Sequence, residues 1–97
     1  MSTEEISALR IGKIRSALES ALSVEQLDIS DESHHHAGHA GARTGLGHFH
    51  VVIAATEFTN QPLVKRHRLV YDALGSLMQS DIHALGIEAF APGEKST

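Results

Sequence analysis

A chain of 97 residues without a single cysteine forms no disulfide, offers no thiolate nucleophile and supplies no sulfur to a metal site. Eight Lys and Arg against twelve Asp and Glu give a formal charge of −4, which argues against the strongly basic surface of a general nucleic-acid coat, although a local basic patch stays open. No apolar run approaches the roughly 20 residues of a membrane-spanning helix. The amino terminus has neither the apolar core of a signal peptide nor the acid-poor composition of a mitochondrial presequence. We therefore expect one cytoplasmic domain over residues 1–97.

The first predicted element is an amphipathic helix over roughly residues 3–22. Ser2 and Glu5 have the spacing of a capping box. Apolar residues then recur at steps of three and four, at Ile11, Ile14, Leu18 and Leu22. A short strand is predicted next, because Leu27 and Ile29 alternate with polar neighbours.

A segment rich in histidine and glycine, about residues 33–47, follows the first strand and is typical of a loop. Its four glycines add backbone freedom that folding must remove, and loops of this length in compact domains are usually functional or disordered. The clearest strand comes directly after it, with Phe49, Val51, Ile53 and Ala55 on one face. We expect this strand to pair with the first one across the loop.

A helical region is predicted after the second strand. Thr59–Pro62 is a helix-entry signal, because proline fits the first turn of a helix, where its missing N–H would have no partner anyway. Val70, Leu74 and Leu77 form the apolar stripe of this region. The pattern leaves open whether it is one helix or a short helix and a longer one.

The last predicted element is a strand over residues 84–91. His83 stands at its start, in phase with the apolar face that includes Leu85, and residues 92–97 are expected to form a disordered tail. The element order α-β-β-α-β predicts an α+β sandwich, in which helices cover one face of a three-stranded sheet.

Histidine dominates the chemistry that this sequence offers. His34, His35, His36 and His39 lie in the loop, and imidazole is the commonest metal ligand among side chains. Three consecutive residues point in different directions and cannot all bind one ion, whereas one turn of chain would bring His36 and His39 together. The alternative is a solvated loop that is merely rich in histidine.

Two further candidates lie outside the loop. His83 is either a ligand or a packing histidine whose ring bonds a nearby carbonyl. The run Lys65-Arg66-His67-Arg68 either contacts phosphates or forms a solvated helix face. No nucleophile elbow, phosphate-binding loop or HExxH motif is present, so the sequence does not predict an enzyme.

Motifs along nearly the whole chain carry a resemblance to a known family. They are Glu32-Ser33-x-x-His36-Ala37-Gly38-His39, Gly47-His48-Phe49-x-Val51, Phe58, Arg66-His67-Arg68-Leu69-Val70-Tyr71-x-x-Leu74 and Ile82-His83-Ala84-Leu85. In these motifs the sequence closely resembles the BolA family. The resemblance implies an α-β-β-α-α-β fold similar to a class II KH domain, which agrees with the order expected from periodicity.

The resemblance also implies that the protein is an iron–sulfur adaptor. Proteins of this family bind a monothiol glutaredoxin as a heterodimer and complete a shared [2Fe-2S] cluster. The family's invariant histidine matches His83, and its loop ligand falls at or near His36, with His34, His35 and His39 as alternates. The glutaredoxin and its glutathione would supply the sulfur ligands, so no cofactor is expected in the isolated chain.

A second role implied by the resemblance is that of a DNA-binding transcriptional regulator of stress, morphology or biofilm genes. The helix–turn region with Lys65, Arg66 and Arg68 would then contact promoter DNA, while His67 would help to hold the turn. No membrane partner is expected. A weak homodimer of the free protein stays open.

Overall fold

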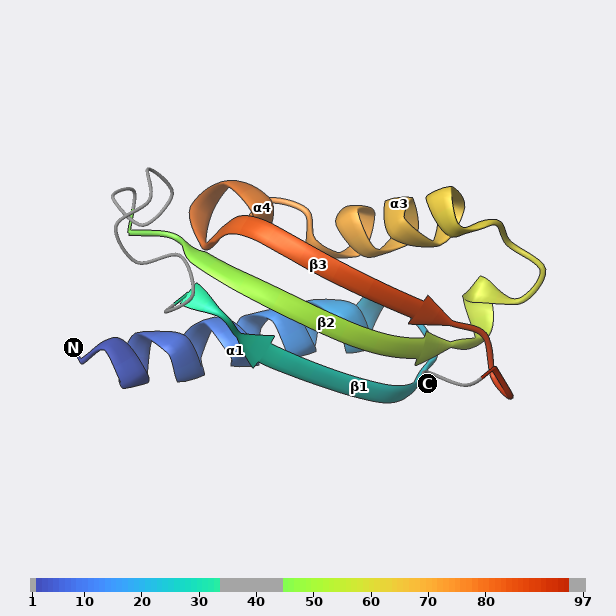
Figure 1. Ribbon diagram of the computed structural model, residues 1–97, viewed down its shortest axis with the longest axis horizontal. Helices are drawn as coiled ribbons and strands as arrows, with labels where there is room; N and C mark the ends of the chain where they lie inside the picture. Colours follow the sequence, from blue (N-terminus) through green and yellow to red (C-terminus); the bar gives the residue numbers. More distant parts are fainter. Residues whose placement is uncertain (1, 34–44, 95–97) are drawn as a thin grey trace.

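The computed structural model describes residues 2–33 and 45–94, which form one three-stranded sheet with helices on one of its faces (Figure 1). This arrangement confirms the predicted α+β sandwich. The elements are α1 (Thr3–Ala21), β1 (Val24–Asp31), β2 (Gly47–Ala55), the 3₁₀ helix η2 (Thr56–Phe58), α3 (Leu63–Leu74), α4 (Leu77–Ser80) and β3 (Ile82–Phe90).

Helix α1 begins at the predicted capping box. The Ser2 hydroxyl accepts from the Glu5 backbone N–H at 3.1 Å, and the Glu5 carboxylate accepts from the Ser2 N–H at 3.0 Å. Two otherwise unpaired donors are thereby satisfied. The apolar face of the helix, including the fully buried Ile14 and Leu18, packs on the sheet as the periodicity predicts.

The sheet has β2 in its centre. β1 pairs with β2 antiparallel, with Leu27 opposite Ile53, which confirms the pairing expected across the loop. β3 pairs with β2 in parallel, with Val51 opposite Ile87. Two parallel neighbours need a long connection, and the chain from η2 through α4 provides it. Because β2 and β3 are parallel, both strands begin at the same end of the sheet.

The core lies between the sheet and the helices. The face of β2 predicted to be apolar is buried along its whole length, and Phe58 of η2, an element that local patterns do not predict, is fully buried as well. The core residues are Ile14, Leu18, Leu22, Phe49, Val51, Ile53, Ala55, Phe58, Val70, Leu74, Ile82, Ala89 and Ala91.

The second helical region is divided into α3 and α4. Pro62 occupies the N-cap position just before α3, and α3 ends at Gly75, whose φ of 53° lies in the left-handed region that favours glycine. α4 then fills the short distance to β3. The region is therefore a longer helix followed by a short one, as in the α-β-β-α-α-β order implied by the resemblance.

Two local predictions are wrong. A register shift between Gly47 and His48 interrupts the alternation at the start of β3, so that His83 is exposed while Leu85 packs against the core. The chain also does not fray at residue 92, because Glu94 returns to bond the backbone N–H of Ala91 at 2.9 Å. Residues 95–97 lie outside the described part of the chain.

Candidate functional site

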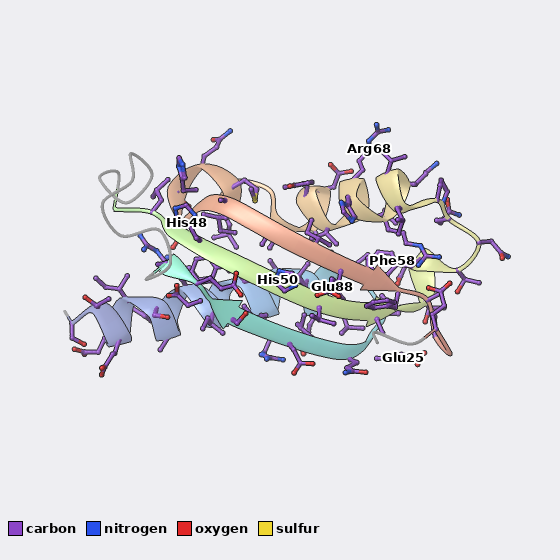
Figure 2. All side chains as sticks on the ribbon, in the orientation of Figure 1. Glu25, His48, His50, Phe58, Arg68 and Glu88 are labelled. Atoms are coloured by element: carbon purple, nitrogen blue, oxygen red, sulfur yellow. The ribbon has the colours of Figure 1, made fainter. Side chains whose placement is uncertain are left out.

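The structure brings His83 next to His48. The two ring centroids are 5.1 Å apart, with an angle of 51° between the ring planes. His48 is the second residue of β2 and is buried, with 7% of its surface exposed, whereas the neighbouring His83 is exposed at the start of β3. Figure 2 shows His48 at the end of the sheet where β2 and β3 begin.

Two imidazoles at this spacing suit a shared metal centre. Ring nitrogens that bind one tetrahedral ion at about 2.1 Å are about 3.4 Å from each other, a separation of the same order as the 5.1 Å between these two ring centroids. Among the residues that the structure describes, no group of three or more His, Cys, Asp or Glu side chains is placed to hold a metal ion. A centre at His48 and His83 therefore needs further ligands from elsewhere.

The pairing of His83 with His48 was not predicted from the sequence. The predicted ligand His36 and its alternates His34, His35 and His39 lie outside the described residues, so the pair of His36 and His83 stays a prediction. One signal for His48 is present in the sequence: it precedes the core residue Phe49 in the strand, and alternation places it on the opposite face.

Backbone hydrogen bonds fix His48 between the two ends of the loop. Its N–H donates to the Ser33 hydroxyl at 3.0 Å, and its carbonyl accepts from the Glu32 N–H at 2.7 Å. The Ser33 N–H in turn donates to the Asp31 carboxylate at 2.8 Å. Although partial burial raises the pKa of Asp31, hydrogen bonds from Ser33 and Ser7 lower it below its usual value. His48 is thus held by an ordered turn at the end of β1.

Asp81 fixes the other strand of the site. This residue, 6% exposed, directly precedes β3, and its carbonyl accepts from the Gly47 N–H at 3.0 Å. Its carboxylate accepts from the Ser80 hydroxyl and from Lys13 Nζ at 3.2 Å. The Ser80 hydrogen bond lowers the pKa of Asp81, against the effect of its burial, and Lys13 lowers it further. Ser80 and the cations of α1 therefore favour the anionic form of this carboxylate, which lies two residues before His83 in the chain.

A pair of one histidine and one glutamate lies further along the open face of the sheet. His50 Nε2 is 2.7 Å from a carboxylate oxygen of Glu88 on the neighbouring strand, and Figure 2 shows the two side chains side by side. Gly86 is opposite His50, and a Cβ there would lie 2.5 Å from His50 Nδ1. The ring therefore lies over the glycine backbone, and its Nε2 is bonded to Glu88.

The predicted nucleic-acid residues divide into two kinds. Lys65 and Arg68 are exposed on α3 (Figure 2, Arg68), whereas Arg66 is buried, with 8% of its surface exposed. The Arg66 guanidinium donates to the carbonyls of Gln61 and Ala89 and to both carboxylate oxygens of Glu94.

The prediction that Arg66 contacts phosphate is wrong, because its side chain is buried and bonded inside the protein. The guanidinium joins α3 to the end of β3, and its donors already have partners inside the protein. A composition-based reading of the basic run treats its residues alike, but the fold exposes Lys65 and Arg68 and buries Arg66. The holding role predicted for the half-buried His67 stays a prediction.

In residues 2–33 and 45–94, no helix has both the length and the apolar character that crossing a membrane requires.

Comparisons with known proteins agree with this fold. The family model described as BolA-like protein matches residues 18–94. SufE-like protein 1, chloroplastic/mitochondrial, of Arabidopsis thaliana is 42% identical over 87 residues, and BolA-like protein 1 of Mus musculus is 41% identical over 81 residues. Each match covers 84% of this chain, but only 24% and 57% of these relatives, so the chain spans less than two thirds of their length.

A solved structure gives the same result. The BolA domain of SufE1 from Arabidopsis thaliana superposes with a TM-score of 0.74 at 40% sequence identity, covering 87% of this chain and 93% of that domain. The shared fold, the identity and the family match over residues 18–94 lead to one conclusion: the chain belongs to the BolA-like family.

Proposed function

We propose that the protein is a non-enzymatic iron–sulfur adaptor that binds a monothiol glutaredoxin and co-ligates a shared [2Fe-2S] cluster. His83 is one ligand, and the second is an imidazole from either His36 in the loop or His48. The observation that carries the proposal is the distance of 5.1 Å between the His48 and His83 rings in a chain without cysteine. The cytoplasm is the expected compartment.

The ligand chemistry supports a shared centre. A [2Fe-2S] cluster takes four ligands from its surroundings, and two imidazoles from this chain leave two positions for sulfur. The absence of cysteine means that this sulfur comes from the partner, as a glutaredoxin thiolate and glutathione. When bound, such a cluster supplies one-electron chemistry, and imidazole ligation raises its reduction potential relative to thiolates.

Protonation gives the proposed site a pH dependence. An imidazole binds a metal only in its neutral form, so acid competes with ligation and favours dissociation of the shared centre.

The test is co-purification with a monothiol glutaredoxin and glutathione under anaerobic conditions. We expect a coloured heterodimer whose visible circular dichroism is lost in His83→Ala. Of His36→Ala and His48→Gln, the variant that removes the second ligand should change the spectrum in the same way. His50→Ala is the matched control, because His50 bonds Glu88 on the same sheet. An unchanged spectrum in His83→Ala would refute the proposal.

A DNA-binding transcriptional regulator of stress, morphology or biofilm genes is the second candidate. The observation that favours it is the exposure of Lys65 and Arg68 three residues apart on one side of α3. Phosphate contacts make affinity depend on salt, with a slope that falls by about one for each contact removed. Mobility shifts at several salt concentrations should therefore show a shallower slope for Lys65→Ala and Arg68→Ala. Unchanged slopes in both variants would remove this mechanism.

A further inference from the structure

Arg10, on the middle of α1, connects the two chain segments that lead into the candidate ligands. Its Nη2 donates to the Gly45 carbonyl at 2.8 Å, and its Nε lies 3.5 Å from an Asp81 carboxylate oxygen. Gly45 precedes β2 by two residues, and Asp81 directly precedes β3. The Arg10 side chain is 19% exposed and the Asp81 side chain 9%, so this ion pair is largely shielded from water, whereas the hydrogen bond to Gly45 is at the surface.

The strand starts need such a connection because their pairing is irregular there. Gly47 is opposite Ile82, but His48 is opposite Ala84, so that one extra residue, His83, lies outside the regular ladder. A backbone hydrogen bond from Gly47 N–H to the Asp81 carbonyl joins the two strand starts before this shift. The separation of the His48 and His83 rings therefore depends on how firmly Gly45 and Asp81 are held.

We propose that Arg10 is a positioning residue for the metal site: by bridging Gly45 and Asp81 it fixes the start of β2 relative to the start of β3, and with them the spacing of His48 and His83. This inference rests on the proposed function. Removal of a residue that orients a metal ligand without itself binding the metal typically lowers metal affinity 10- to 100-fold. Arg10 touches neither imidazole, and its effect is exerted through the backbone that carries them.

Lys13 provides a natural control, because it shares only one of the two contacts. Its Nζ is 3.2 Å from the same Asp81 carboxylate, but its side chain is 55% exposed and it does not bond Gly45. A lysine ammonium is a single point of charge, whereas the guanidinium fork of arginine bonds two acceptors in a fixed geometry. Loss of Lys13 removes charge from Asp81 without separating the two strand starts.

The first test uses the protein without a cluster. Hydrogen exchange of the Gly47 amide, measured by NMR, reports how often the strand starts separate. We expect Arg10→Gln to speed this exchange about tenfold, the factor that corresponds to one charge-assisted hydrogen bond, and to shift the ring resonances of His48 and His83. Lys13→Gln should leave both unchanged. Identical exchange in the two variants overturns the positioning role.

The second test uses the reconstituted heterodimer with a monothiol glutaredoxin. Arg10→Gln should lose its cluster about tenfold faster than the wild type and alter the shape of the visible circular dichroism, while Lys13→Gln resembles the wild type. Thermal unfolding of both variants shows whether a general loss of stability explains the difference, which would overturn the inference. A wild type that forms no cluster refutes the proposed function alone, because the exchange measurement still decides the role of Arg10. A stable cluster with a wild-type spectrum in Arg10→Gln refutes the inference alone.

Discussion

Replacement of Arg66 by methionine separates its structural role from any role in nucleic-acid binding. The guanidinium donates to the Gln61 carbonyl at 2.8 Å, to the Ala89 carbonyl at 3.1 Å and to Glu94 at 2.6 and 3.1 Å. Methionine keeps most of the aliphatic stem and removes all of these donors. The variant therefore measures what the hydrogen bonds contribute to the free energy of unfolding.

The expected cost follows from the two carbonyls. Each loses a charge-assisted donor, and the Ala89 carbonyl lies in a buried position. At about 1.5 kcal/mol for each bond, the lower end of the range for a charged donor, the free energy of unfolding should fall by about 3 kcal/mol. In a domain of this size such a loss lowers the Tm by roughly 10–20 °C. The exposed carboxylate of Glu94 returns to water and adds little, because exposed ion pairs contribute little to stability.

Urea denaturation followed by far-ultraviolet circular dichroism measures this change. Arg68→Met is the matched control: it is on the same helix but exposed, so its stability should stay within about 0.5 kcal/mol of the wild type. Equal stability of the two variants would refute the structural role of Arg66. If Arg66→Met is destabilised as expected, weaker DNA binding by it reports unfolding and not a lost phosphate contact.

Two further predictions concern glycine spacing and acid stability. Gly47→Ala should lower the free energy of unfolding by about 1–3 kcal/mol, because its Cβ would collide with the buried Phe49 ring. Gly86→Ala should lower it by less than about 1 kcal/mol, since the partly exposed His50 ring can move away. Urea denaturation measures both changes, and equal losses of stability in the two variants would contradict this difference. The Arg66 hydrogen bond lowers the pKa of Glu94 from 4.5 to about 2, so its stabilising effect is present above pH 4.5 and is lost as the pH falls towards 2. The stability difference between the wild type and Glu94→Gln should therefore shrink over that pH range in urea titrations, and a gap independent of pH would show that the carboxylate charge is irrelevant.

The elements that local periodicity predicts are those with one fully buried face. In β2, Phe49, Val51 and Ile53 alternate with less buried neighbours, so a two-residue period is visible in the sequence itself. Helix α1 also has one buried face, with Ile14 and Leu18 four residues apart, and its capping box marks its first residue. Where burial depends on distant parts of the chain, as for Phe58 in η2, local patterns carry no signal.

The candidate site shows the same limit. His48 and His83 are 35 positions apart in the sequence, and only the parallel register of β2 and β3 brings their rings together. The burial of Arg66 likewise depends on Glu94, 28 residues further along the chain. Residue type and family resemblance identified His83 and the basic run as candidates, but neither could tell which side chains the fold exposes.

The parallel pairing of β2 and β3 gives the molecule two distinct poles. His48 lies next to His83 at the end where both strands begin, while Arg68 lies on α3 towards the other end of the long axis (Figures 1 and 2). Lys65 precedes Arg68 by about one turn of the same helix. The molecule measures 39 × 22 × 22 Å, so these poles are separated along its greatest dimension. A glutaredoxin docked at one pole would leave the other open, and the two proposed functions then predict a ternary complex in place of competition between partner and DNA.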